Sequence, residues 1–450
     1  MSIKNLKKED SFMIFVESCA DNAFPDSLPD LLYYEKSLFL RICTGQPLLK
    51  ELFFNGYKDR LLNISQYGPQ RFFVELLIIK LNIPIFLAKI LFKIKFSAAL
   101  LRMSFYWESK EVTGNLSSYK NLTFLMSDFE RLTNRFTSVI RDAKNICEIN
   151  SDNRVRLISN GSNSYFFLPR LTAYQFLSVL FAPAWKMTYL IRAYKQSNFI
   201  KKYSIGSVYI MDGDSPSTVS SSYAAYLASA TSICIQWGAM VYGIKPGYKL
   251  FPCDYFLCTG QYYVDLLSPF SKKTKFLVSG FINDAKFDKK NDINRCKSIL
   301  FLLEDTETVI TKEESDLMVN LCIETKRRFP DLNITARPHP DMTIEEDFVV
   351  LFKKYGVVVD RTPTPRITLS LNKFVVGHAS SLMIESVEYD CLPVFMEIGI
   401  KQLQPDLVAL SAAMKFETKK EWFVLLNNLL NNYCNYEAEI SLKNSLNNSY

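Results

Sequence analysis

The chain has 450 residues, enough for two or three domains with a large hydrophobic core. Hydrophobic residues make up 48% and charged residues 22% of it, ordinary values for a globular chain that argue against wholesale disorder and against a polytopic membrane protein. The 53 Lys and Arg against 46 Asp and Glu leave a net charge of +7. This mild bias is not typical of a nucleic-acid-binding protein, and we expect no nucleic-acid partner.

Cysteine and histidine usage gives no metal-binding pattern. The ten cysteines form no C-x-x-C motif, and only two histidines are present to complete a site. We therefore expect no structural zinc site and no bound metal. The N-terminal region has only a short apolar run, Phe12 to Val16, which is too short for a secretory signal. The sequence predicts a cytoplasmic protein with reduced thiols.

Two stretches are strongly apolar, residues 72–101 and 171–185. Glu75 and several lysines interrupt the first, and the second is also shorter than the roughly 18 to 20 residues that a membrane-spanning helix needs. Apolar residues interleaved with Lys are typical of a helix that lies in a membrane interface. They are equally typical of a core helix whose lysines reach solvent. Both interpretations stay open for residues 72–102 and 171–202.

The first 200 residues have a mainly helical pattern. A change comes near Tyr203, after which the sequence predicts a strand at Val208–Met211 and a second strand at Ile233–Gln236. Between them Ser215 is placed as a helix N-cap and Pro216 as the first helical residue. The segment is thus one β-α-β unit, which we expect to be parallel and right-handed.

A second alternation of strands and helices begins near Lys297, after a Gly-, Asn-, Asp- and Lys-rich segment at 279–296 that is typical of a linker. A capping box, Thr311 with Glu314, marks the first helix. The alternation predicts an α/β fold with an open parallel sheet covered on both faces. We expect an N-terminal domain at 1–280, a second domain at 297–425, and a C-terminal helix and tail at 426–450. The segments of the second alternation are strands at 298–304, 333–341 and 357–360, helices at 311–329 and 344–356, and a strand-turn-helix-strand region at 372–395.

Ligands of open α/β sheets bind beyond the carboxyl ends of the strands, so the turns that follow strands are the candidate sites. Four such turns carry polar or small residues. They are Asp212 to Asp214, Gln236 to Gly238, Arg337 to Pro340, and Gly377 to Ser381.

The last turn has the composition of an anion site. Ser380 and Ser381 stand between an apolar strand and a helix, whose first free N–H groups would face the turn. Glu385 follows one helical turn later, where its carboxylate could accept hydrogen bonds from ribose hydroxyls. Together these groups fit a nucleotide mono- or diphosphate. The alternative is ordinary capping of the helix by a serine.

Both histidines of the chain, His339 and His378, fall in these turns. With Arg337 and the serine pair they predict an anion-binding cleft. Pro340 restricts its neighbour to extended geometry and so fixes the direction of the His339 side chain. A histidine by itself is as readily a surface or core residue.

Asp212 and Asp214 follow a strand and precede a helix. Either carboxylate could act as a general base on an acceptor hydroxyl, or Asp214 and Ser215 could simply cap the helix. No P-loop, G-x-G-x-x-G, H-E-x-x-H or G-x-S-x-G motif occurs. Kinases, dinucleotide dehydrogenases, zincins and lipase-type hydrolases therefore lack sequence support.

At these motifs the chain resembles the bacterial surface-polysaccharide glycosyltransferases of the GT-B type, which have two Rossmann-like domains facing a cleft. Sialyltransferases, polysialyltransferases and Kdo transferases are among them. Those families carry an acidic turn in the first domain, and a His-Pro motif and a Ser-rich turn in the second. Their counterparts here are Asp212 to Asp214, His339 with Pro340, and Ser380 with Ser381. The resemblance covers about residues 205–400.

The resemblance implies a nucleotide-sugar donor whose phosphate is held by His339 and by Ser380 and Ser381, and whose ribose is held by Glu385. Arg337 and His378 are further donor-binding candidates. Asp212 or Asp214 would be the catalytic base.

Sialyltransferase-like relatives often carry two acids before a glycine where this chain has Gln236, Trp237 and Gly238, so it departs from the family pattern there. Gln236 and Gly238 are kept as cleft candidates. The family implies no cofactor and a metal-independent reaction. The segment Asp212 to Asp214 formally matches a D-x-D motif. The alternative to a metal-independent reaction is therefore that these two aspartates bind a metal ion.

The predicted activity is transfer of a sugar to a hydroxyl of a bacterial surface glycan, such as capsule or lipopolysaccharide. The motifs favour a CMP-activated ulosonic acid, sialic acid or Kdo, and leave UDP-sugars open. The protein would work in the cytoplasm, with peripheral contact to the inner membrane. The alternatives are a CDP-glycerol-type polyol-phosphate transferase and a non-catalytic scaffold of polysaccharide assembly.

Overall fold

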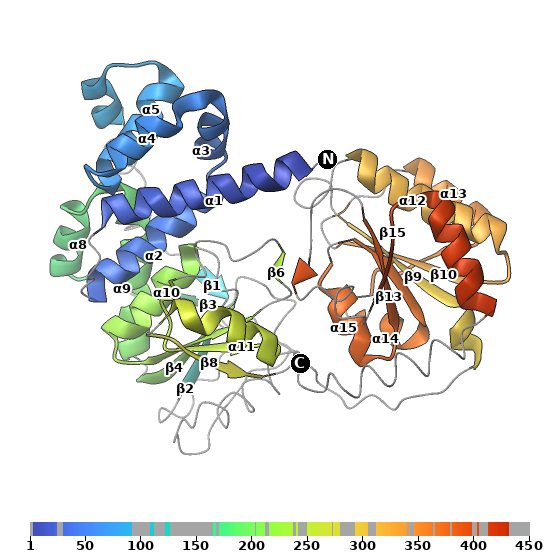
Figure 1. Ribbon diagram of the computed structural model, residues 1–450. Coiled ribbons are helices and arrows are strands. Elements are labelled where there is room, and N and C mark those ends of the chain that lie inside the picture. The colour runs from blue at the N-terminus through green and yellow to red at the C-terminus, as the bar shows by residue number, and fades with distance from the viewer. Residues whose placement is uncertain are drawn as a thin grey trace. The chain divides into compact units, whose positions relative to one another are not determined.

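A computed structural model gives the arrangement of most of the chain (Figure 1). By contacts within the chain, two compact units can be separated. The N-terminal unit comprises residues 8–237 and 244–284, and the C-terminal unit comprises residues 1–7, 238–243 and 285–450. The structure describes residues 3–24, 30–91, 109–111, 122–126, 165–167, 171–202, 204–211, 216–236, 240–241, 250–271, 273–279, 293–304, 312–339, 342, 346–362, 365–378, 380–397, 403–404 and 413–431.

The first 200 residues are helical over most of their described length, which confirms the predicted pattern. Three short strands also occur there that the sequence analysis did not predict: β1 Ser109–Glu111, β2 Leu122–Met126 and β3 Tyr165–Phe167. The helices are α1 Ile3–Ala23, α2 Asp30–Thr44, α3 Pro47–Leu52, the π-helical η1 Phe53–Tyr57, α4 Lys58–Ser65, α5 Pro69–Leu81, a helix at 85–91, α8 Ala173–Leu180, η3 Ala184–Lys186 and α9 Met187–Lys202.

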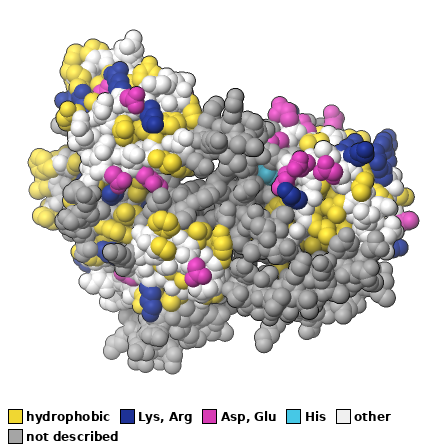
Figure 2. Space-filling view, viewed as in Figure 1, with side chains coloured by type: hydrophobic (Ala, Val, Ile, Leu, Met, Phe, Trp, Pro, Cys, Tyr) yellow, Lys and Arg dark blue, Asp and Glu magenta, His cyan; other side chains and the backbone are white. Residues whose placement is uncertain are grey.

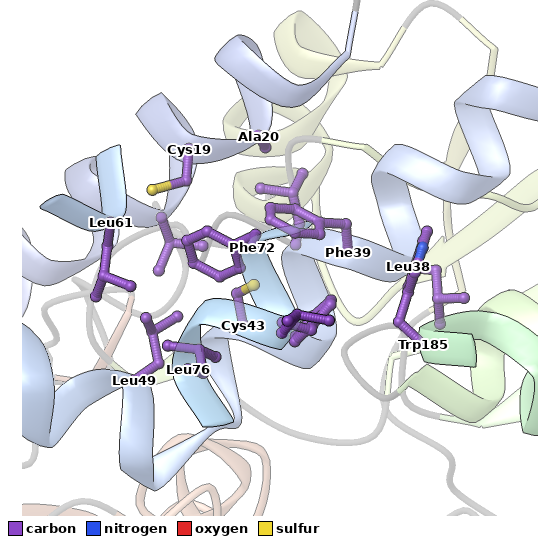
Figure 3. Packing of buried hydrophobic residues seen from close by; sticks show 14 of the residues in the cluster. Cys19, Ala20, Leu38, Phe39, Cys43, Leu49, Leu61, Phe72, Leu76 and Trp185 are labelled. Atoms are coloured by element: carbon purple, nitrogen blue, oxygen red, sulfur yellow. The ribbon is translucent and has the colours of Figure 1, made fainter. Parts of the chain in front are cut away.

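Aromatic side chains form the centre of the helical core (Figure 3). The ring of Phe39 on α2 meets those of Phe72 and Phe73 on α5 edge-on, with centroids 5.5 and 5.7 Å apart. Phe73 in turn stacks on Trp185 of η3 at 5.9 Å. Edge-to-face and stacked aromatic pairs add to the stabilisation from burial alone. This packing joins α2, α5 and η3, so α5 is a core helix.

The sheet of the N-terminal unit is entirely parallel, in the order β2-β4-β5-β7-β8. The predicted β-α-β unit is confirmed as β4, α10 and β5, and α10 begins at Pro216 as expected. The strands of the N-terminal sheet lie side by side in the order in which they occur along the chain. The described part of this sheet therefore contains no reversal of strand order. The remaining bounds are β4 Ile205–Met211, α10 Pro216–Leu227, β5 Thr231–Ile235, β7 Tyr255–Cys258, α11 Gln261–Leu267, η5 Ser268–Phe270 and β8 Lys275–Val278.

The C-terminal unit has a six-stranded parallel sheet in the order β11-β10-β9-β12-β13-β15. A two-stranded antiparallel pair accompanies it, β6 Met240–Val241 with β14 Leu403–Gln404. Its elements are η6 Ile293–Lys297, β9 Ser298–Leu303, α12 Lys312–Arg328, β10 Asn333–Pro338, α13 Glu346–Tyr355, β11 Val358–Val359, α14 Pro365–Leu371, β12 Phe374–Gly377, α15 Leu382–Glu388, β13 Leu392–Met396, β15 Met414–Phe416 and a last helix at 419–431.

Both faces of this second sheet are covered, as predicted. Every residue of β9 is buried. Ile299 and Phe301 belong to the core that includes α12, α13 and the last helix. Leu302 alternates with them and points to the opposite face, where Met383 of α15 lies near it across Gly377. A strand buried on both sides explains the uninterrupted apolar run at 298–303.

The predicted fold class is thus confirmed: the chain is an α/β protein with two Rossmann-like units and a helix-rich N-terminal half. The predicted domain boundaries, 1–280, 297–425 and 426–450, and the cleft between the domains stay predictions. The last helix begins at residue 419, and its Trp422, Leu426 and Leu429 are buried in the core of the C-terminal unit.

Candidate functional site

The strand order of the C-terminal sheet reverses between β9 and β12. From β9 the chain moves outward to β10 and β11 on one side, and then returns to place β12, β13 and β15 on the other. In open α/β sheets a crevice forms at such a point, beyond the carboxyl ends of the two strands. The residues that follow β9 and β12 are therefore the first to consider.

Three adjacent strands bring polar side chains to this edge. Glu304 follows β9 and is buried, at 5% exposure, and His378 follows β12 at 4%. His339 follows β10 and is exposed. Its backbone N–H donates to the Leu303 carbonyl at 2.7 Å, which places it beside the end of β9. The edge thus brings together both histidines that the sequence selected and one glutamate that it did not.

His378 is held in one orientation by a backbone contact. Its Nδ1 lies 3.0 Å from the carbonyl oxygen of Met396. Because a carbonyl only accepts, Nδ1 must carry the hydrogen. Burial lowers the pKa of His378, and the Met396 carbonyl and the nearby Glu314 carboxylate oppose that shift less strongly. The ring is therefore neutral at pH 7.

The other ring nitrogen of His378 is enclosed by the protein. Nε2 is buried and has no hydrogen-bond partner among the described residues. In the neutral ring with hydrogen on Nδ1, Nε2 is an acceptor. A buried acceptor without a partner is destabilising, and such groups call for an explanation. A ligand hydroxyl or N–H satisfies it directly, whereas a phosphate would first require protonation of the ring.

The serine turn continues from His378 into α15. The Ser380 hydroxyl accepts weakly from the Leu382 N–H at 3.4 Å, and its carbonyl accepts from the Met383 N–H at 3.0 Å. Ser381 is the N-cap residue, yet its side chain makes no capping hydrogen bond. Both serines are partly exposed. The Ser381 hydroxyl is thus not used in the capping role that was the alternative interpretation of this turn.

Gly377 allows α15 to approach the sheet closely. A Cβ at this position would lie 2.8 Å from the Met383 sulfur and 3.3 Å from Cβ of Leu302. Only glycine therefore fits without displacement of a neighbour. The glycine sets the height of the serine turn above the ends of β9 and β12.

Glu385 lies on α15 one turn after Ser381, and its backbone N–H donates to the Ser381 carbonyl at 3.1 Å. Its side chain is half-buried. This position places it on the same short helix as the serine turn, and its role toward a ribose stays a prediction.

Arg337 is committed to a structural contact. Its guanidinium pairs with the Asp360 carboxylate and donates to the Thr362 carbonyl at 2.8 Å. Although burial acts to raise the pKa of Asp360, hydrogen bonds from Thr368, Thr362 and Arg337 outweigh it, and the pKa is lowered. The ion pair fixes the loop after β11 to the end of β10. A phosphate would have to share this guanidinium with Asp360, so the donor-binding role of Arg337 stays a prediction.

In the N-terminal unit, Gln236 follows β5 and is buried. Its Oε1 accepts from the Thr259 backbone N–H at 3.1 Å and from the Thr259 hydroxyl at 3.4 Å. The side chain thus joins the carboxyl ends of β5 and β7. Gly238 and the two acids of the first turn, Asp212 and Asp214, lie outside the described residues.

Within the described residues, no group of three or more His, Cys, Asp or Glu side chains is placed to hold a metal ion. The same residues include no helix with the length and apolar composition needed to cross a membrane.

The sequence analysis did not select three acids of the C-terminal unit as site residues: Glu304, which follows β9, Glu314 on α12, and Asp360, which follows β11. The signal for Glu304 was present, since it directly ends a run of apolar residues that reads as a strand. Glu314 was interpreted only as part of a capping box, and its proximity to His378 depends on how α12 packs.

No family model matches the chain, and no curated protein matches it. Some solved structures do resemble it. The S. aureus MnaA-UDP co-structure is 10% identical over 71% of this chain and 90% of its own, with a TM-score of 0.45. The Neisseria meningitidis UDP-GlcNAc 2-epimerase bound to UDP-GlcNAc is 10% identical over 71% and 85%, with a TM-score of 0.44.

A third similar structure is the glycotransferase of kitacinnamycin, 12% identical over 72% of this chain and 94% of its own, with a TM-score of 0.41. Similarity at this level does not identify the activity of this chain. The fold assignment rests on the two parallel sheets described above.

Proposed function

We propose that the protein is a glycosyltransferase that moves a sugar from a nucleotide donor to a hydroxyl of a bacterial surface glycan. The donor binds in the C-terminal unit, at the carboxyl ends of β9 and β12. One observation carries the proposal: the buried Nε2 of His378 has no hydrogen-bond partner in the described part of the chain and lies where the strand order reverses. The favoured donor is a CMP-activated ulosonic acid, such as sialic acid or Kdo.

In this proposal different side chains at the carboxyl edge of the sheet bind different parts of the donor. Nε2 of neutral His378 accepts a hydrogen bond from a hydroxyl or N–H of the nucleoside or sugar. Ser380, Ser381 and the exposed His339 hold the phosphate, since hydroxyls and an imidazole N–H donate to phosphate oxygens. Glu385 accepts from the ribose hydroxyls.

The transfer itself needs two functions on opposite sides of the reacting carbon. The acceptor oxygen attacks the anomeric carbon as the bond from that carbon to the donor phosphate oxygen breaks, and the acceptor proton passes to a carboxylate. Asp212 or Asp214 is the proposed base. Fixed hydrogen-bond donors at the phosphate stabilise the charge on the leaving group. The proposed reaction needs no metal.

A membrane surface is the proposed location of the acceptor, on the cytoplasmic face of the inner membrane. The helix at 85–91 supports this, because Ile85, Phe86, Leu87, Ile90 and Leu91 are each between 36% and 63% exposed. The neighbouring Lys80 and Lys89 are exposed as well. Apolar side chains beside lysines suit an interface with anionic headgroups.

Donor screening tests the proposal. The full chain is incubated with CMP-sialic acid, CMP-Kdo, UDP-sugars and CDP-glycerol, each with a surface-glycan acceptor, and nucleotide release is measured. Release from a CMP-sugar that falls at least tenfold in the Asp214→Ala or the Asp212→Ala variant supports the proposal. Release from CDP-glycerol alone favours the polyol-phosphate transferase.

The scaffold alternative has its own test in cells. Deletion of the protein should abolish the surface polymer, and the His339→Ala and Asp214→Ala variants should fail to restore it. Full restoration by both variants would identify a non-catalytic scaffold.

A further inference from the structure

A second candidate binding site lies on the C-terminal unit at the end of α12. A surface cavity of about 700 Å³ opens there, within the range of small-ligand sites. It is lined by residues at the end of α12 and on the helix at 419–431, and no acid is among them. Figure 2 shows Lys and Arg side chains gathered at this end of the unit.

The cavity is far from the edge that carries His378. In a parallel α/β unit each helix runs antiparallel to the strands, so α12 starts near the carboxyl edge and ends at the opposite one. With 17 residues it is about 25 Å long. The two sites therefore occupy opposite edges of the same sheet.

Two cations of the cavity are fixed in place by a mostly buried acid. Glu324 accepts from Arg328 at 2.8 Å and also pairs with Lys419, and its own side chain is only 13% exposed. Lys420, next in the chain, is exposed and has no ion-pair partner among the described residues. The cavity thus has more positive charge than Glu324 neutralises. Two of its three cationic side chains, Arg328 and Lys419, are held in place by their ion pairs with this acid.

The wall beside these cations is aromatic. The Arg328 guanidinium lies 4.0 Å from the ring centroid of Phe423, and Phe329 stacks on the same ring at 6.3 Å. Asn427 and Asn428, both exposed, complete the lining with amide groups. Phe423 itself is only 9% exposed, so the half-buried Phe329 and the exposed Val424 supply the apolar surface of the cavity. Such a surface suits the apolar faces of sugars, and amides both donate to and accept from hydroxyls.

From these residues we infer that the cavity binds an acidic oligosaccharide, with a sugar ring beside Phe329, hydroxyls on the two asparagines and a carboxylate at Lys420 and Arg328. A cation set without aromatic and amide groups would suit any polyanion, whereas this combination suits a carboxylated sugar. The inference does not depend on the proposed transfer reaction, because it uses none of the residues of the His378 edge.

The test measures binding of fluorescently labelled trigalacturonate to the full chain by anisotropy, at low salt. Lys420→Glu should weaken binding by about tenfold, since attraction between charges at a partly exposed site is strong at low ionic strength. Asn428→Ala should weaken it by about threefold, because it removes an amide that hydrogen-bonds to sugar hydroxyls. Lys353→Glu is the matched control: Lys353 is an exposed lysine of α13 outside the cavity, and its reversal should change affinity less than twofold.

Three outcomes would overturn the inference. They are no saturable binding of trigalacturonate, an equal loss of affinity in Lys353→Glu and Lys420→Glu, and tighter binding of tripolyphosphate or duplex DNA than of trigalacturonate. Maltotriose, the neutral counterpart, should bind at least tenfold more weakly. Equal affinity for it would exclude the proposed carboxylate contact.

Discussion

Substitution of Gly377 by alanine tests the close packing that positions the serine turn. The new methyl group would lie 2.8 Å from the Met383 sulfur and 3.3 Å from Cβ of Leu302. The sulfur belongs to a flexible side chain and can move, but Cβ of Leu302 is fixed to a strand that is buried on both faces. Overpacking of this kind destabilises a protein by roughly 1 to 3 kcal/mol. We expect a loss of about 2 kcal/mol in the free energy of unfolding.

Urea denaturation of the wild type and the variant measures this loss. Gly206→Ala is the control, because a Cβ on Gly206 of β4 would meet no atom within 4 Å. It should change stability by less than about 0.5 kcal/mol, as surface substitutions do. The double variant Gly377→Ala, Met383→Ala should be less destabilised than the sum of the single variants, since the added methyl group takes space that the sulfur leaves.

Equal stability of Gly377→Ala and Gly206→Ala would refute the reasoning. So would strict additivity in the double variant, because it would mean that the two side chains do not compete for the same space.

Further predictions concern Asp360, the cysteines and the exposed helix. The pKa of Asp360 is lowered in the folded state. Its contribution to stability is therefore complete above the unfolded pKa of about 3.9 and is lost as the pH falls through the folded pKa. Arg337→Gln should reduce the loss of unfolding free energy that is measured between about pH 6 and pH 2. Burial raises the pKa of the Cys322 thiol, whereas Cys296 is partly exposed, so mass spectrometry should find native-state alkylation at Cys296 and none at Cys322. Phe86→Asp should reduce flotation with anionic vesicles at least threefold, and unchanged flotation would exclude the helix at 85–91 as the contact.

Local signals in the sequence predicted the elements well where they were strong. Pro216 marked the first residue of α10, and the apolar run before Glu304 marked β9. The turn with Ser380 and Ser381 does stand between a buried strand and a helix. Each of these features depends on residues within a few positions of each other, which is the range over which capping and periodicity act.

Features that depend on distant contacts were not predicted. The five residues of β2 join the N-terminal sheet only through pairing with β4, about 80 residues later. The ion pair of Arg337 with Asp360 was not predicted, because Asp360 follows the neighbouring strand β11. Which nitrogen of His378 lacks a hydrogen bond among the described residues depends on the Met396 carbonyl of β13. Sequence spacing contains no information on such pairings.

The central claim is that a nucleotide binds at the carboxyl ends of β9 and β12 and uses Nε2 of His378. The most direct measurement is the melting temperature of the full chain with CMP, UDP, CDP or GDP, for the wild type and for His378→Phe. A ligand at 100 times its Kd stabilises the folded state by about 2.7 kcal/mol. The account predicts a clear rise with CMP in the wild type, and little or no rise in a His378→Phe variant that still melts cooperatively. Indifference of the wild type to all four nucleotides, or an undiminished rise in the variant, would contradict it.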